Sequence, residues 1–118
     1  MNIEELRNYC ISKPYVEECF PFDETTLVFK VGGKMFLLTD LDGDLYMIIK
    51  AKPESVIERI ERYSDTDEGF HMNKKHWIRV RLENNLDIKR IENWIDESYR
   101  LVFDSLPKRK REELNTLL

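Results

Sequence analysis

The fold of this chain is decided by residues 25–39, TTLVFKVGGKMFLLT. Side chains alternate along the first half as they do on a β-strand. One face takes Leu27, Phe29 and Val31, and the other takes Thr26, Val28 and Lys30. Gly32 and Gly33 then supply the positive φ angles of a two-residue turn. The stretch therefore predicts an antiparallel β-hairpin whose second strand covers residues 34–39.

Weaker strand patterns lie on both sides of the hairpin. Upstream, residues 16–20 fit a short edge strand that Pro21 ends. Downstream, a turn over residues 40–44 leads into an apolar run over 45–50, and residues 77–82 alternate once more. We therefore expect an antiparallel meander plus one later strand. Between them we expect a polar, acidic loop over residues 64–69 and an irregular segment over 70–75.

Four helices are expected around this sheet, and the first is the clearest. Asn2 and Glu5 fit a capping box at its start, and Pro14 stops it. Its apolar face consists of Ile3, Leu6 and Cys10. The other three helices begin at Lys52-Pro53, at Asp87 and at Pro107.

The two C-terminal helices complete the expected architecture. The helix from Asp87 places Ile91, Ile95 and Tyr99 on one face, so we expect it to pack on the sheet. The apolar residues of the terminal helix are Leu114, Leu117 and Leu118. The length of 118 residues is close to the commonest size of a single domain. We predict one α+β domain over residues 1–118, with an antiparallel sheet packed by an N-terminal helix and C-terminal helices.

Composition and charge indicate the compartment and limit the partners. Apolar residues make up 42% of the chain, and no apolar run approaches the roughly 20 residues needed to span a bilayer. The amino terminus is acidic and lacks the order of a signal peptide. We therefore expect a cytoplasmic protein with no membrane partner, in which Cys10 and Cys19 are reduced thiols. The net charge of −4 argues against DNA, because cations on the protein must neutralise phosphates.

One segment gathers most of the candidate binding chemistry. It is HMNKKHW, residues 71–77, and Arg79 and Arg81 follow on the next strand, where they share a face with Trp77. In one interpretation Trp77 stacks on a base or an aromatic ligand while the cations hold phosphate. In the other, Trp77 packs at the edge of the core under a helix, the arginines pair with carboxylates and the lysines are solvated. The residues alone favour the second interpretation, because basic clusters are common on surfaces of mixed charge.

Metal sites and catalytic motifs are not expected. The turn over residues 40–44 differs from a calcium loop because its flanks are strands and the twelfth position is Ala51. His71 and His76 supply two ligands where zinc requires three or four. The sequence contains no Gly-rich phosphate loop, nucleophile elbow or paired-carboxylate motif. We therefore expect no cofactor and no enzymatic activity.

Several short motifs occur along the chain in a recognisable order. They are Tyr9-Cys10, Lys13-Pro14, Phe22–Val31 with Gly32-Gly33 and Met35-Phe36, Ile48–Ala51, Pro53-Glu54, His71–Trp77, Asp96–Tyr99 and Leu101-Val102. In this order the chain resembles the MmcQ/YjbR family of small bacterial proteins, nearly from end to end. The resemblance implies helices against an antiparallel sheet, grouped with CyaY-like or secretion-chaperone-like architectures. The resemblance also implies DNA binding, because the family is commonly labelled so, and it implies no reaction or cofactor.

Two hypotheses for the function follow. The resemblance puts first a DNA-binding protein with a local basic and aromatic surface. Its candidate nucleic-acid-binding residues are Lys50, His71, Asn73, Lys74, Lys75, His76, Trp77, Arg79 and Arg81. The alternative is a protein-interaction or chaperone-like module in which the basic cluster is incidental. The deciding observation is whether the lysines and arginines of this set form one continuous positive patch.

Overall fold

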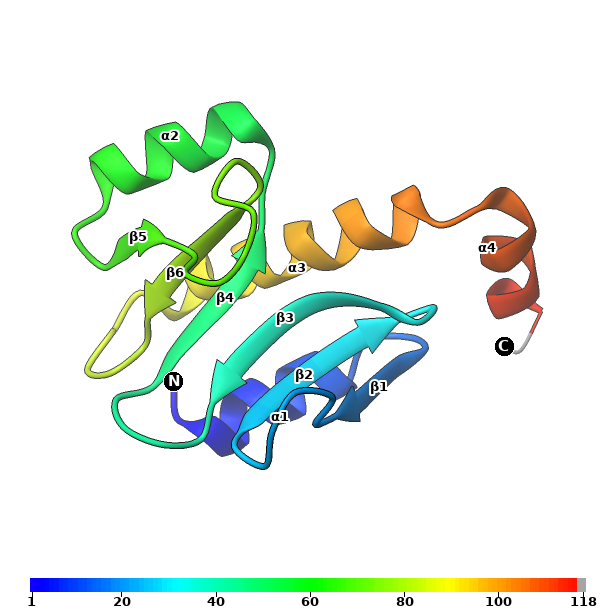
Figure 1. Ribbon diagram of the computed structural model, residues 1–118, viewed down its shortest axis with the longest axis horizontal. Coiled ribbons are helices and arrows are strands. Elements are labelled where there is room, and N and C mark those ends of the chain that lie inside the picture. The colour runs from blue at the N-terminus through cyan, green and yellow to red at the C-terminus, as the bar shows by residue number, and fades with distance from the viewer. Residues whose placement is uncertain (117–118) are drawn as a thin grey trace.

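The computed structural model describes residues 1–116, which form one six-stranded sheet and four helices (Figure 1). In chain order the elements are α1 (Ile3–Ile11), β1 (Val16–Cys19), β2 (Thr26–Val31), β3 (Lys34–Asp40), β4 (Tyr46–Lys50), α2 (Pro53–Arg62), β5 (Thr66–Glu68), β6 (Trp77–Arg81), α3 (Ile88–Ser105) and α4 (Lys108–Asn115). Every pair of neighbouring strands is antiparallel. The predicted α+β class, with an antiparallel sheet, is confirmed.

The hairpin of β2 and β3 has the predicted two-residue turn. Val31 pairs with Lys34 across it, and the glycines between them have φ angles of 58° and 84°. Gly32 also lies against Leu106, since a Cβ at this position would come within 2.6 Å of Cδ1 of that side chain. This turn therefore fixes both the hairpin and its contact with the end of α3.

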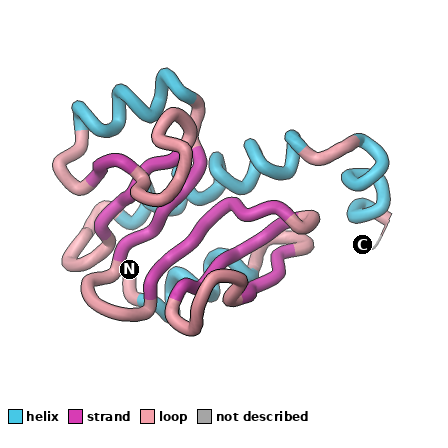
Figure 2. The backbone as a smooth tube through the Cα atoms, in the orientation of Figure 1, coloured by secondary structure: helices cyan, strands magenta, loops and turns pink. Residues whose placement is uncertain are grey.

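The strand order is β1-β2-β3-β4-β6-β5, so the chain leaves the meander after β4, forms α2 and returns (Figure 2). The prediction of a loop over residues 64–69 was wrong at its centre, where Thr66–Glu68 pairs with β6 as an edge strand. The segment is too short to show a period, and Asp and Glu are depleted in strands. The carboxylate of Asp67 forms an ion pair with Arg79 of β6, and that of Glu68 forms one with Lys74 of the loop before β6.

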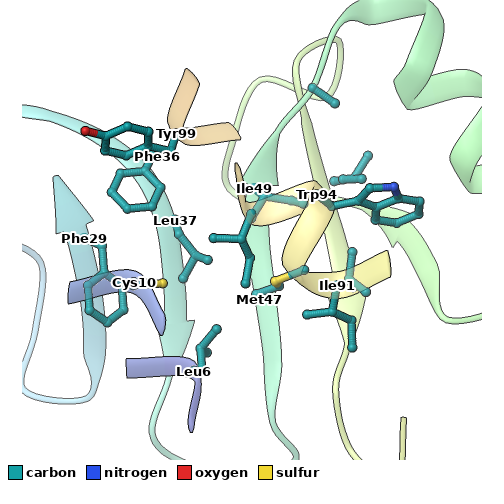
Figure 3. Packing of buried hydrophobic residues seen from close by; sticks show 14 of the residues in the cluster. Leu6, Cys10, Phe29, Phe36, Leu37, Met47, Ile49, Ile91, Trp94 and Tyr99 are labelled. Atoms are coloured by element: carbon teal, nitrogen blue, oxygen red, sulfur yellow. The ribbon is translucent and has the colours of Figure 1, made fainter. Parts of the chain in front are cut away.

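Helices cover one face of the sheet, which we call the covered face. Figure 1 shows α1 and α3 behind the strands, and α2 beside the β5 and β6 end. The core packs between these helices and the sheet, with Leu6 and Cys10 from α1 against Phe29 of β2 (Figure 3). Helix α3 contributes Ile91 and other buried side chains, as the sequence predicts. We call the opposite face of the sheet, where no helix lies in residues 1–116, the open face.

The capping box of α1 is confirmed, because Asn2 Oδ1 accepts from the backbone N–H of Glu5 at 2.8 Å and the Glu5 carboxylate accepts from the N–H of Asn2. Helix α4 differs from expectation, since none of its described side chains is buried. Of its expected apolar residues, Leu117 and Leu118 lie outside the described part of the chain. No helix within residues 1–116 is long and apolar enough to cross a membrane.

Candidate binding surface on the open face of the sheet

A continuous row of side chains crosses the open face through all six strands. Strand register places Cys19, Val28, Leu38, Ile48, Arg79 and Asp67 side by side in that order. The apolar members form a second, smaller cluster that is separate from the main core. Along this row the open face is therefore apolar over β2, β3 and β4 and charged over β6 and β5.

Trp77 belongs to this smaller cluster. It is 9% exposed and packs with Val28, Leu38 and Ile48, while Met72 packs against the same group. The loop over residues 69–76 folds back on it, since the carbonyl of Trp77 accepts from the N–H of Gly69 and its own N–H donates to the carbonyl of Asn73. Trp77 is thus a packing residue at the edge of the core, as the second interpretation has it, but a loop covers it in place of a helix.

The same loop sets the positions of the remaining candidate residues. Asn73 accepts from the N–H of Lys75 through Oδ1 at 2.9 Å, and its carbonyl accepts from the N–H of His76 at 3.0 Å. This tight turn leaves Lys74, Lys75 and His71 exposed and His76 half-buried. His71 has a φ of 64°, a conformation that costs energy for a residue other than glycine.

The basic residues of the cluster are largely paired with acids of β5. Arg79 donates two hydrogen bonds to the carboxylate of Asp67, at 2.7 and 2.6 Å, and Arg81 donates a third at 3.0 Å. These contacts, with the Arg79 hydrogen bond first, lower the pKa of the Asp67 carboxyl. Lys74 lies 3.3 Å from Glu68. The five cations therefore do not form one continuous unpaired patch.

Lys50 and Lys75 are the two lysines of the cluster that form no ion pair within the described residues. Lys50 pairs with Trp77 across β4 and β6, so the two lysines lie at the same end of the open face as the loop. The structure thus brings the nine candidate residues to one region and neutralises most of the positive charge there.

A cleft opens on the same face, between the β1–β2 loop and the loop after β5. It has a volume of about 430 Å³ and is lined by Phe22, Asp23, Thr26, Leu38, Asp40, Tyr46, Ile48, Phe70, His71 and Met72. Phe22 is 65% exposed and Phe70 is 38% exposed, which is unusual for side chains of their size. The cleft thus combines a floor of apolar strand residues with aromatic walls.

The charged side chains that line the cleft are carboxylates. Asp23 accepts hydrogen bonds from the N–H groups of Thr25 and Thr26 at 2.9 and 2.6 Å, and these bonds lower the pKa of its carboxyl. Asp40 lies near Tyr46, whose pKa is raised by burial and by the negative charge of Asp40. The lining of the cleft is therefore aromatic with two carboxylates, and the guanidinium of Arg79 lies against two of its rings.

Sequence reasoning missed the cleft, although one signal was present. Phe22 and Phe70 each stand in a polar stretch, PFDE and EGFH, where a large apolar side chain has no strand or helix pattern to bury it. An aromatic residue in such a loop is a candidate contact residue. Only the fold shows that these two loops meet over β3 and β4.

Motifs that carry the family resemblance also have structural roles far from the cleft. Tyr9 donates a hydrogen bond to Asp96 at 2.7 Å, and Lys13 forms an ion pair with the same carboxylate. Tyr99 donates to the carbonyl of Pro14 at 2.7 Å. These contacts tie the end of α1 to α3. Within residues 1–116, no group of three or more His, Cys, Asp or Glu side chains is arranged to hold a metal ion.

Comparison with known proteins shows which family this chain is similar to. A family model described as YjbR matches residues 11–101. Among curated proteins, YbdF of Escherichia coli O157:H7 is 34% identical over 112 residues, which cover 94% of this chain and 92% of that protein. YjbR of Escherichia coli K12 is 30% identical over 115 residues, which cover 97% of this chain and 98% of that protein. Both relatives are named as uncharacterised proteins.

Two solved structures share the architecture. A crystal structure of a Deinococcus radiodurans protein with a DUF419 domain has a TM-score of 0.89 and 36% identity, over 97% of this chain and 88% of that one. A Pseudomonas syringae protein has a TM-score of 0.75 and 25% identity, over 86% of this chain and 99% of that one. They define a class of small α+β proteins with an open antiparallel sheet. This chain belongs to the YjbR family, also called MmcQ/YjbR, and the resemblance seen in the sequence is confirmed.

Proposed function

We propose that this chain is a non-enzymatic binding protein that receives a segment of a partner protein on the open face of its sheet. One observation carries the proposal. An aromatic cleft lies on the open face between two loops, with Phe22 and Phe70 exposed at its walls. Exposed aromatic side chains around an apolar floor are typical of protein recognition sites. Asp23 and Asp40 each accept a backbone N–H of the turn that follows, which fixes the polar groups of the cleft.

The basic cluster beside the cleft supports a protein ligand over duplex DNA. Arg79 and Arg81 share the carboxylate of Asp67, and Lys74 is close to Glu68. A phosphate that bound these cations would have to displace carboxylates held by short hydrogen bonds. The gain from releasing counterions, which supplies most non-specific DNA affinity, is therefore reduced.

Selection from a display library of random short peptides tests the proposal. Peptides that are enriched on the native chain should bind it in calorimetric titration and should lose most of their affinity for a Phe70→Ala variant. Leu86→Ala is the matched control, because Leu86 is 93% exposed and does not line the cleft. No enrichment above background, or peptides that bind both variants equally, would contradict the proposal.

DNA binding, which the family resemblance implies, is a second candidate, and Lys50 and Lys75 support it. They carry the unpaired positive charge of the cluster among the described residues and lie at one end of the open face. Two phosphate contacts would give a slope of about −2 for log K against log salt, from −0.9 per contact. Replacing both lysines by glutamine should abolish that slope, as fluorescence anisotropy with a labelled duplex would show. If the salt dependence of binding persists after both lysines are replaced, they are not the phosphate contacts, and this second candidate loses its basis.

A further inference from the structure

We infer that the cleft on the open face is a subsite for one basic side chain of the partner, with an arginine guanidinium or a lysine ammonium between Phe70, Tyr46 and Asp40. This inference rests on the proposed function and names the chemistry that the cleft would recognise. Three features of the cleft support it: the charge of its lining, a guanidinium already seated on two of its rings, and the turns that hold its carboxylates.

The charge of the lining selects a cation. Among the residues that line the cleft there is no lysine or arginine, whereas Asp23 and Asp40 are both present. The remaining lining side chains are apolar, aromatic or polar, and His71 among them is exposed. A cation that enters this space meets two carboxylates and the faces of aromatic rings, both of which attract positive charge.

The protein's own Arg79 shows that these rings accept a guanidinium. Its central carbon lies 4.9 Å from the centroid of the Phe70 ring and 5.6 Å from that of Tyr46, while Asp67 neutralises its charge. Arg79 is not among the side chains that line the cleft, although it contacts two rings that do. A ligand cation on the cleft side, with Asp40 as its carboxylate, would repeat this arrangement.

The walls and carboxylates are held in place before any ligand binds. Asp23 is fixed by N–H groups of the following turn, and Asp40 accepts from the N–H of Asp42 at 2.9 Å. The rings of Phe70 and Tyr46 pack edge to face at 5.6 Å. Because these groups are already ordered, binding of a side chain would lose little of its affinity to their immobilisation.

Blocked amino acids are suitable probes because the partner is unidentified. N-acetyl-arginine methylamide and its neutral isostere N-acetyl-citrulline methylamide differ in charge but little in shape. We expect amide resonances of the two cleft loops to shift on titration with the arginine probe. The citrulline probe should bind roughly tenfold more weakly, since a cation–π contact and a carboxylate pair together contribute about one power of ten. Equal binding of both probes would overturn the inference.

Asp40→Asn and Asp42→Asn form a matched pair for the same titration. Both remove one negative charge from the same turn, but only Asp40 lines the cleft, and asparagine keeps the oxygen that accepts from the N–H of residue 42. Asp40→Asn should weaken the arginine probe severalfold, whereas Asp42→Asn should not. An unchanged amide spectrum outside the turn shows that each variant is folded. Equal effects of both variants would show that the probe responds to the net charge of the chain and not to Asp40, and would overturn the subsite.

Exchanging arginine for citrulline within the selected peptides separates this inference from the proposed function. Peptides that need Phe70 but tolerate the exchange would leave the proposed function standing and overturn the subsite. An arginine probe that shifts the cleft, in the absence of any selected peptide, would support the subsite and contradict the protein-segment ligand. Affinity that depends on both Phe70 and the arginine charge is the result that we expect.

Discussion

Within residues 1–116, the covered face of the sheet is closed by helices, whereas the open face is closed by loops. On the covered face, Phe36, Ile49 and Ile95 are fully buried between strands and α3. On the open face, Ile48 is also buried, but it lies under Trp77 and beside a cleft with exposed phenylalanines. This difference indicates that the covered face provides stability and that the open face is the one available for binding. We expect changes on the covered face to unfold the chain, and changes on the open face to alter binding in a folded chain.

The largest expected effect is on the covered face, at Phe36. Its ring packs edge to face on Tyr99 at 5.4 Å and against Phe29 at 6.5 Å. Phe36→Ala leaves a cavity and should lower the free energy of unfolding by about 3–5 kcal/mol in urea titration. Ile57→Ala is the control, because Ile57 is 63% exposed, and its effect should stay within about 0.5 kcal/mol. Similar losses of unfolding free energy in Phe36→Ala and Ile57→Ala would contradict the claim that the covered face determines stability.

A smaller loss is expected at Ser98, which joins α3 to two strands. Its hydroxyl donates to the carbonyl of Phe36 at 2.6 Å and accepts from the N–H of Lys50 at 2.9 Å. Ser98→Ala leaves both buried backbone groups without this partner and should cost about 1–3 kcal/mol in the same titration. Ser105→Ala, in the same helix but at the surface, is the control and should have little effect. A neutral Ser98→Ala would show that the strands do not need this bridge.

Most of the covered face could be predicted from the sequence, because its patterns are local. Alternation on β2 and helical spacing on α3 each place apolar residues on one face, and the paired glycines fix the turn between β2 and β3. The open face depends on contacts between distant segments. Nothing local shows that Asp67 lies beside Arg79, since three residues with two acids do not form a strand pattern. The cluster and the pairing of its arginines with carboxylates were therefore predicted, but the partner, Asp67, was not.

The smallest effect on stability is expected at Asp67, and it depends on pH. The hydrogen bond from Arg79 lowers the pKa of the Asp67 carboxyl below its ordinary value of about 3.9. A carboxyl with a lowered folded-state pKa stabilises the fold above its unfolded pKa, and this stabilisation is lost as the pH falls through the folded-state pKa. The free energy of unfolding of the native chain should therefore exceed that of Asp67→Asn by at most about 1 kcal/mol near neutral pH, because the pair is partly exposed.

Urea titrations across a pH series check this prediction. The difference between the native chain and Asp67→Asn should stay constant above about pH 5 and shrink as the pH falls below about 4. Glu68→Gln is a useful comparison, because the Glu68 carboxylate is more exposed and meets Lys74 at a longer distance. A difference that grows in acid would mean that the Asp67 pair does not stabilise the folded state.

The central claim is that the acids of β5 prevent the basic cluster of the open face from acting as a DNA surface. Its most direct test is the salt dependence of duplex binding for the native chain and for an Asp67→Asn/Glu68→Gln double variant. Asp42→Asn/Asp44→Asn, with the same change in net charge outside the cluster, is the control. The native chain and the control should give a slope no steeper than about −2, and the β5 variant should approach about −4.5, for five free cations. A native slope already near −4.5, unchanged by the β5 variant, would contradict the account.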